Sequence, residues 1–263
     1  MLKRRLIPVL YLQHGWMVRS ELFKLHQVIG NPIVHVERMV QWDVDELIVL
    51  DISTGDETQF QHNRDDYRNP GARDLLGFIN KVAGECRIPL TFGGRIRSFA
   101  DARARIVNGA DKVTINTAAF EQPQLVTEIA HAFGSQAVVA GIDYRLIDGK
   151  PRVFVDHGTR DTGLAVASWA RRLQEAGAGE ILLNAIDRDG TAQGYDCETI
   201  ASTVDAVTIP VIACGGAGHQ RHFLECFERT QASAVAAGNI FHFTENAYPR
   251  AKTFLRSKRE DIR

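Results

Sequence analysis

Short runs of apolar residues recur along the chain, and stretches with helical periodicity separate them. Several of these runs, such as 47–50, 137–140 and 181–183, are apolar at every position rather than at alternate positions. Strands of that kind are typical of a parallel sheet that helices cover on both faces. Eight strands are predicted, at 6–12, 46–51, 90–92, 112–115, 136–143, 180–185, 210–214 and 232–237. Amphipathic stretches such as 123–133 and 164–176 are long enough to be crossover helices.

The second half of the chain repeats the order of motifs in the first half. Segment 44–50 is similar to 178–184, segment 88–94 to 209–216, and segment 110–113 to 232–235. Eight strand–helix units in 263 residues also fit the roughly 250 residues of a (β/α)8 barrel. We therefore predict an α/β fold, a TIM barrel built from two repeated half-barrels in a single domain over 1–263. The alternative is an open, doubly wound sheet, which also has buried parallel strands.

Two long polar segments interrupt the regular pattern, and we expect both to be loops on one face. Segment 53–72 follows the second predicted strand, and segment 144–163 follows the fifth. In a barrel both would lie at the carboxyl ends of the strands, where active-site loops occur. Within the second segment, 153–155 is expected to pair as a small hairpin.

The charge balance excludes some classes of partner. The chain has 31 Lys and Arg against 32 Asp and Glu, a formal net charge of −1. A general binder of nucleic acid or anionic membranes needs a surplus of cations, so neither partner is expected. No apolar run approaches the roughly 20 residues of a membrane helix. The basic residues 3–5 and the apolar run 6–12 imitate a signal peptide, but the run is short and contains Pro8, so it is predicted to be a strand.

The four cysteines form no CxxC pair and no metal-ligand spacing with histidine. We interpret them as reduced, buried side chains of a cytoplasmic protein. No metal site and no cofactor are predicted.

Glycine-rich turns follow two predicted strands that the repeat makes equivalent. Gly93 and Gly94 follow the third strand, and Gly215 and Gly216 follow the seventh. Glycines let backbone N–H groups approach a phosphate, and helix N-termini add positive partial charge. Taken alone, a Gly-Gly pair indicates only a tight turn. The matched pair predicts two anion sites and a long ligand with a charged group at each end.

Ten motifs, spread over nearly the whole chain, lie at 7–8, 45–47, 50–52, 111–113, 115–119, 177–183, 186–191, 194–196, 215–218 and 241–243. As a set they resemble one known family, the cyclase subunit of imidazole glycerol phosphate synthase (the HisF type). In that family the barrel receives ammonia from a glutaminase that docks on its N-terminal face. It uses the ammonia to cleave and cyclise a ribonucleotide with two phosphates. The resemblance implies a HisH-like glutaminase as partner in a heterodimer.

The resemblance also implies roles for single positions. Asp143 matches one of the family's two catalytic aspartates. Predicted phosphate ligands are Gly94, Arg95, Asn116 and Thr117 for one site, and Asp189, Gly190, Gly215, Gly216, Gly238 and Asn239 for the other. In the family, a charged ring at the barrel floor gates the entry of ammonia, and its matches here are Arg5, Glu46, Lys112 and Glu180. Asp111 matches a position that faces the glutaminase. Structural ion pairs at the barrel floor are the alternative for the charged ring.

Three positions depart from the family pattern. Tyr11 stands where the second catalytic aspartate is expected, so a phenol with a reference pKa of about 10 replaces a carboxyl of about 3.9. Arg95 replaces the third glycine after the third strand, and Arg19 replaces an expected lysine. An arginine can clash with a phosphate at the usual place or grip a different anion.

These departures resemble a paralogous branch of the family that carries Asn184 where the histidine enzyme tends to have threonine. Proteins of that branch act with a glutaminase-like partner and a sugar amidotransferase in the synthesis of bacterial surface polysaccharides. Sugar amidation is therefore the first hypothesis. The alternatives are the cyclase of histidine biosynthesis, and a non-catalytic scaffold that activates its glutaminase.

Overall fold

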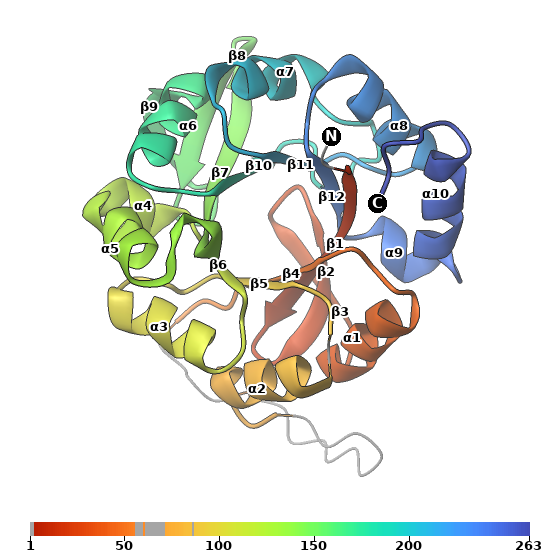
Figure 1. The fold of residues 1–263 in the computed structure, drawn as a ribbon, viewed down its shortest axis with the longest axis horizontal. Coiled ribbons are helices and arrows are strands. Elements are labelled where there is room, and N and C mark those ends of the chain that lie inside the picture. Colours follow the sequence, from red (N-terminus) through yellow and green to blue (C-terminus); the bar gives the residue numbers. More distant parts are fainter. Residues whose placement is uncertain (1–2, 56–59, 61–71, 86) are drawn as a thin grey trace.

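The parallel strands close into a barrel in the computed structural model, which describes residues 3–55, 60, 72–85 and 87–263 (Figure 1). Within these residues, hydrogen bonding runs in the order β10-β11-β12-β1-β4-β5-β6-β7, and β7 pairs with β10 to complete the circle. The predicted eight-stranded barrel is thereby confirmed, and the open sheet is excluded. Its strands are β1 (Arg5–Gln13), β4 (Leu47–Asp51), β5 (Leu90–Gly93), β6 (Lys112–Ile115), β7 (Val138–Ile147), β10 (Glu180–Ala185), β11 (Val211–Cys214) and β12 (Ala234–Ala237).

Helices surround the barrel and connect its strands (Figure 1). They are α1 (Pro32–Gln41), α2 (Leu75–Glu85), α3 (Phe99–Val107), α4 (Thr117–Glu121), α5 (Gln124–Phe133), α6 (Val166–Glu175), α7 (Cys197–Ala206), α8 (Gln220–Arg229), α9 (Ile240–Phe243) and α10 (Ala247–Arg256), with a 3-10 turn η1 (Ser135–Ala137). Side chains cap several of them at the N-terminus: Asn31 accepts a hydrogen bond from Ile33 N in α1, and Ser98 accepts one from Asp101 N in α3. Such caps satisfy N–H groups that the helix itself leaves free.

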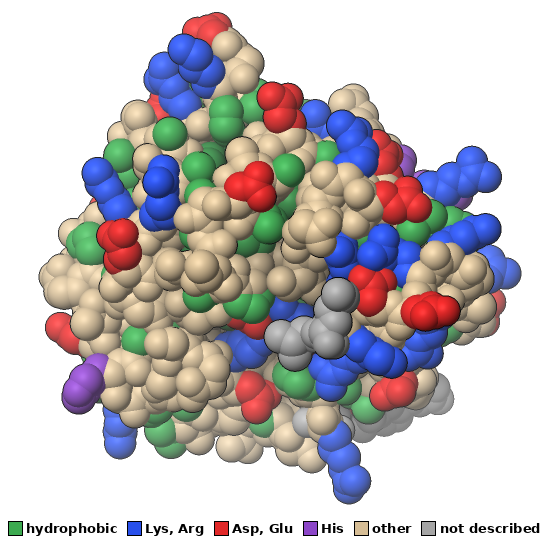
Figure 2. Space-filling view, turned by 45° about the horizontal axis from the view of Figure 1, so that its top comes forward, with side chains coloured by type: hydrophobic (Ala, Val, Ile, Leu, Met, Phe, Trp, Pro, Cys, Tyr) green, Lys and Arg blue, Asp and Glu red, His purple; other side chains and the backbone are tan. Residues whose placement is uncertain are grey.

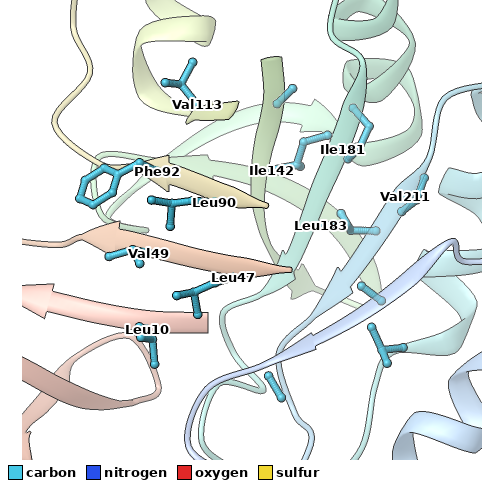
Figure 3. Packing of buried hydrophobic residues seen from close by; sticks show 14 of the residues in the cluster. Leu10, Leu47, Val49, Leu90, Phe92, Val113, Ile142, Ile181, Leu183 and Val211 are labelled. Atoms are coloured by element: carbon cyan, nitrogen blue, oxygen red, sulfur yellow. The ribbon is translucent and has the colours of Figure 1, made fainter. Parts of the chain in front are cut away.

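Two separate apolar layers explain why the strands are apolar at every position. In β1, Leu6, Leu10 and Leu12 pack outward against the helices, whereas Ile7 and Val9 point into the barrel. Figure 3 shows the outer layer, with side chains of neighbouring strands directed towards the surrounding helices. Because both faces of each strand are covered, alternation of polar and apolar residues disappears.

An antiparallel hairpin follows the first barrel strand and was not predicted from the sequence. It consists of β2 (Trp16–Glu21), which pairs with the end of β1, and β3 (Leu25–Gly30), which pairs with β2 alone. Most of β3 is exposed. The hairpin contacts the loops after two other strands, because Leu22 N donates to Asp189 O and Asn239 Nδ2 donates to Ser20 O.

The prediction of a long loop at 144–163 is wrong. β7 continues to Ile147, and β8 (Lys150–Val155) and β9 (Arg160–Ala165) form antiparallel strands beside it. The expected hairpin at 153–155 is confirmed. The polar side chains that indicated a loop belong to strands at the rim of the barrel, where one face is solvated. Most of the other predicted loop, at 53–72, lies outside the described residues.

The surface carries charges of both signs. Figure 2 shows Lys and Arg side chains interspersed with Asp and Glu on one face, in keeping with the near-zero net charge. In the described part of the chain, no helix has the length and apolar character needed to cross a membrane.

Candidate functional site

Asp143 lies at the carboxyl end of the barrel between two asparagines. Asn116 Nδ2 donates to Asp143 Oδ2 at 2.7 Å, and Asn184 Nδ2 donates to Asp143 Oδ1 at 2.9 Å. Burial raises the pKa of Asp143 to about 6, although the two amide hydrogen bonds act in the opposite direction. A carboxyl with that pKa exchanges protons readily near neutral pH, which suits a general acid or base.

Tyr11 points into the same end of the barrel from β1. Its side chain is 3% exposed and belongs to the same interior cluster as Cys214. Burial raises the pKa of the Tyr11 phenol well above its ordinary value. Gly238 makes room for the ring, since a Cβ there would lie 3.1 Å from Tyr11 Cε2. Tyr11 therefore stays protonated at neutral pH and cannot accept a proton in place of an aspartate.

A pocket of about 190 Å³ opens beside Tyr11, between the loops after β10, β11 and β12. Its lining includes all six residues predicted for one phosphate site: Asp189, Gly190, Gly215, Gly216, Gly238 and Asn239. Gly216 has a φ of 98°, and a Cβ there would lie 2.2 Å from Gly194 O, so only glycine fits this turn. Arg19 lines the same pocket, with its guanidinium over the Phe243 ring at 5.5 Å, and supplies a positive charge. The residues that the predicted phosphate site requires therefore lie together in the structure, and phosphate binding itself stays a prediction. A larger, open groove of about 660 Å³ lies on the outer surface at α10, away from these side chains.

Asp189 has a structural role at the edge of the pocket. Its carboxylate accepts hydrogen bonds from Ser20 Oγ at 2.6 Å and from Phe23 N at 3.2 Å, which fixes the β2–β3 hairpin. Burial raises the pKa of Asp189. Because the Asp189 carboxylate is bound to the hairpin in this way, it stabilises the wall of the pocket. It is less suited to contact an anion directly.

Replacing Ser20 with alanine tests this role. Because Asp189 would lose its shortest hydrogen bond while staying buried, we expect a loss of about 1–3 kcal/mol in the free energy of unfolding. Urea denaturation measures the loss. The matched control is Ser202→Ala, which removes a hydroxyl that donates only to a helix carbonyl and should change stability by less than about 0.5 kcal/mol.

The other predicted phosphate site is less well formed. Asn116 is bound to Asp143, and the Thr117 hydroxyl accepts a hydrogen bond from Asp156 N. The Arg95 guanidinium donates to Gly55 O at 3.0 Å and lies 4.0 Å from the Asp51 carboxylate. These side chains are engaged with the protein itself. Gly94 turns the chain here, since a Cβ would lie 1.9 Å from Asp51 O, and the residues Gly94, Arg95, Asn116 and Thr117 do not line the pocket described above.

Four charged side chains meet at the amino end of the barrel. Arg5 Nη1 lies 2.5 Å from Glu46 Oε2 and 3.2 Å from Glu180 Oε1. Lys112 Nζ lies 2.9 Å from Glu46 Oε1 and 3.1 Å from Glu180 Oε2. Each cation thus bridges both glutamates, and the four groups close a ring across the floor. Asp111 lies beside it, exposed, with its carboxylate accepting a hydrogen bond from Leu90 N.

The interior above this floor ring is mainly apolar, although the buried Thr91 and Thr114 also face it. Ile7, Val9, Ile48, Val139, Leu182 and Ile212 fill the layer between the ring and Tyr11. A small neutral molecule can cross such a layer more easily than an ion, because the layer offers a charge no compensating partner. The barrel therefore has a charged floor, an apolar middle and a polar mouth around Asp143.

Comparisons with known proteins identify the family. A family model described as "Histidine biosynthesis protein" matches residues 5–247. The chain is 40% identical over 263 residues to imidazole glycerol phosphate synthase subunit HisF of Chlorobium luteolum, covering 100% of both chains. This chain belongs to the HisF family. The HisF subunit of Thermotoga sp. (strain RQ2) is 39% identical, with 100% of this chain and 98% of that protein covered. The subunit of Alkaliphilus metalliredigens is 40% identical over 256 residues, with 97% and 96% covered.

The names of these HisF relatives bear on the two catalytic hypotheses. Each is named as a subunit of imidazole glycerol phosphate synthase. They support the histidine-pathway hypothesis better than sugar amidation, on which the comparisons give no information.

Three hydrogen bonds that build the site were not predicted from the sequence. The Ser20–Asp189 hydrogen bond joins residues 169 positions apart, and neither side chain carries a pattern that indicates the pairing. The amide contacts to Asp143 had one available signal, because Asn116 and Asn184 both follow or end predicted strands that flank 136–143 in a barrel.

The raised pKa of Asp143 predicts how stability depends on pH. The folded protein holds a proton on Asp143 up to about pH 6, whereas the unfolded chain loses it near pH 4. The contribution of Asp143 to the free energy of unfolding is therefore fully present below pH 4, and it is lost as the pH rises to about 6. Replacing Asp143 with asparagine should raise the free energy of unfolding by about 1–3 kcal/mol at pH 7 and leave it nearly unchanged at pH 4. Urea denaturation at both pH values measures this, and an equal change at both would contradict it.

Proposed function

We propose that this protein is the ammonia-receiving synthase subunit of a glutaminase–synthase pair. The observation that carries the proposal is the floor ring of Arg5, Glu46, Lys112 and Glu180 beneath an apolar interior that leads to Asp143. Ammonia is small and neutral, so it suits that interior. The glutaminase would dock over the floor ring, and Asp111 lies at the same end.

The pocket at the mouth supports a phosphorylated ligand. Glycine turns after β10, β11 and β12 line it, where a phosphate can approach the backbone closely, and Arg19 adds a cation. Arginine binds phosphate well because its planar guanidinium offers several donors in a fixed geometry. The ligand would place a phosphate in this pocket and its reacting atoms near Asp143.

Two reactions are open to such a subunit. The names of the relatives support cyclisation of the two-phosphate ribonucleotide, as in histidine biosynthesis. Tyr11 supports the second candidate, in which ammonia passes on to a sugar amidotransferase of surface-polysaccharide synthesis. General acid–base help is worth about 10²- to 10⁴-fold, and a phenol whose pKa is raised by burial cannot supply what the family's second aspartate does.

A steady-state assay distinguishes the two reactions. The purified protein is supplied with ammonium and the histidine-pathway ribonucleotide, beside the Thermotoga relative as a reference. If tyrosine at position 11 prevents cyclisation, turnover should be lower than that of the reference by about 10²-fold or more. Turnover at the reference rate, or rescue of a histidine auxotroph, would support the histidine-pathway function instead.

A second assay tests the glutaminase pairing and the scaffold alternative together. Lys112→Ala opens the floor ring and should change the glutaminase activity of the partner. Asp143→Ala should abolish product formation by the complete assembly if the barrel takes part in the chemistry. Unchanged product formation with Asp143→Ala would favour the non-catalytic scaffold. Unchanged glutaminase activity with Lys112→Ala would contradict the pairing.

A further inference from the structure

Equivalent turns follow β5 and β11 in the two halves of the barrel. We matched their residues by counting on from the Ile-Pro pair that begins each of the two similar segments. Gly94 then corresponds to Gly215, and the next residue, Arg95, corresponds to Gly216. The φ angles of Arg95 and Gly216 are both positive, at 54° and 98°. An arginine therefore stands in the first half where the second half has a glycine that lines its pocket.

The backbone of the two turns agrees with this match. A Cβ at Gly94 would lie 1.9 Å from the oxygen of Asp51, the last residue of β4. A Cβ at Gly215 would lie 2.5 Å from the oxygen of Ala185, the last residue of β10. Each turn thus passes closely over the end of the neighbouring strand, which only glycine at this position allows.

The Arg95 side chain crosses to the neighbouring loop of the first half. Its Nη2 donates to Gly55 O at 3.0 Å. Gly55 follows the end of β4 by as many residues as Asp189 follows the end of β10. In the second half, Asp189 and Gly216 both line the pocket. The Arg95 guanidinium therefore lies across the space that corresponds to this pocket.

Contacts on both sides hold Arg95 in this place. Arg105 on α3 is 5% exposed, and its Nη2 donates to Gly94 O at 3.3 Å and to Arg95 O at 3.2 Å. The Asp51 carboxylate, which is 3% exposed, lies 4.0 Å from Arg95 Nη1 and compensates its charge. A residue other than glycine keeps a left-handed backbone only where its surroundings determine it in this way.

This arrangement leaves little for an anion in the first half. A phosphate at a glycine turn needs open space beside backbone N–H groups. Here it would have to displace the guanidinium from Gly55 O and then lie near the negative charge of Asp51. The neighbouring Thr117 hydroxyl already accepts a hydrogen bond from Asp156 N.

We infer that Arg95 closes the anion site of the first half-barrel, so that this protein binds its ligand through one phosphate, in the pocket lined by Gly215, Gly216 and Gly238. The inference rests on the proposed function and deepens it, because it names the substrate class: a phosphate monoester that needs no second anion for binding. A ligand with two phosphates binds through one of them and leaves the other in water.

The test follows backbone amide resonances of the ¹⁵N-labelled protein during titration with sodium phosphate at pH 7. In the unaltered protein, the Gly216 amide should shift and saturate while the Gly94 amide stays unchanged. Sodium chloride at equal ionic strength should shift neither amide. A saturable shift at Gly94 in the unaltered protein would show that phosphate enters the first half, and it would overturn the inference.

Replacing Arg95 with glycine should open the closed site, because glycine readily adopts the φ of 54° at this position. In Arg95→Gly, the Gly94 amide should shift and saturate together with that of Gly216. The matched control is Arg97→Ala, which removes an exposed cation close by in the chain and should leave Gly94 unresponsive. Arg95→Ala is the second variant, should Arg95→Gly fail to fold. An unresponsive Gly94 in a folded variant overturns the role of Arg95.

Affinities for ligands with one and two phosphates give a second readout. Arg95→Gly should bind the histidine-pathway ribonucleotide about tenfold more tightly than the unaltered protein does, the value of a hydrogen bond to a charged group. Its affinity for glycerol phosphate should not change. Calorimetry measures both. An equal gain for both ligands, or no gain for either, contradicts the closure of a second phosphate site.

The outcome separates this inference from the proposed function. Saturable shifts at both turns of the unaltered protein would remove the inference and leave the phosphate pocket and the glutaminase pairing standing. Shifts at neither turn would remove the phosphate pocket of the proposed function, and the inference with it. The glutaminase pairing would then still be decided by the effect of Lys112→Ala on the partner.

Discussion

Replacing Tyr11 with aspartate is expected to raise ammonium-dependent cyclisation of the histidine-pathway ribonucleotide by about 10²- to 10⁴-fold. The reason lies in the mouth of the barrel, where Tyr11 and Asp143 belong to facing strands and burial holds the phenol protonated. A carboxyl at position 11 restores the pair of acid–base groups that the family uses. Initial rates at saturating ammonium measure the gain.

Two further variants make the experiment specific. Tyr11→Phe removes only the hydroxyl, so its cyclisation rate should equal that of the unaltered protein. The double variant Tyr11→Asp with Asp143→Asn should lose the gain, since one carboxyl again acts alone. If Tyr11→Phe lowers the rate strongly, the phenol takes part in the reaction, and the argument from its raised pKa is wrong. Thermal melts establish that each variant is folded.

The barrel was predictable because its two apolar layers leave a direct trace in the sequence. In β1, Ile7 and Val9 fill the interior while Leu6 and Leu10 face the helices, so the run reads as apolar throughout. The repeat indicated how the strands connect, because two copies of a four-strand unit close most simply into one eight-stranded barrel. Its pairing of Glu46 with Glu180 also indicated that both lie at strand starts, as the floor ring confirms.

The β2–β3 hairpin could not be predicted in the same way. β3 is largely exposed and bonds only to β2, so it lacks the burial that produces a hydrophobic pattern. Its position depends on Ser20 meeting Asp189, a contact between distant segments. The prediction of a loop at 144–163 failed for a different reason. The polar residues of this segment lie on antiparallel strands with one solvated face, and such strands resemble a loop in composition.

The residues transferred from the family lie together where the backbone alone decides the geometry, and lie apart where side chains compete for contacts. The glycine turns at Gly215 and Gly216 come together with Gly238 as expected. For Arg95 the sequence left open a clash with a phosphate or a grip on a different anion, and in the structure its guanidinium contacts Gly55 O and approaches Asp51. A substituted residue forms whichever contacts its new surroundings offer, and the sequence does not contain that information.

Replacing Glu46 with alanine is expected to lower the free energy of unfolding by about 3–5 kcal/mol. Glu46 is 1% exposed and accepts hydrogen bonds from Arg5, Lys112 and Thr91. Without it, two cations remain at the floor with Glu180 as their shared carboxylate in the ring. An uncompensated charge out of water costs much more than the loss of one surface contact. Urea denaturation at neutral pH measures the effect.

The matched control is Glu225→Ala on α8, which breaks an exposed ion pair with Arg229. Solvent screens that pair, so its loss should cost less than about 1 kcal/mol. The contrast between the two glutamates distinguishes a floor ring closed to water from one that is solvated. A cost at Glu46 as small as that at Glu225 would mean that water reaches all four charges. The floor would then be open to solvent, and ammonia delivered there could escape before it reached Asp143.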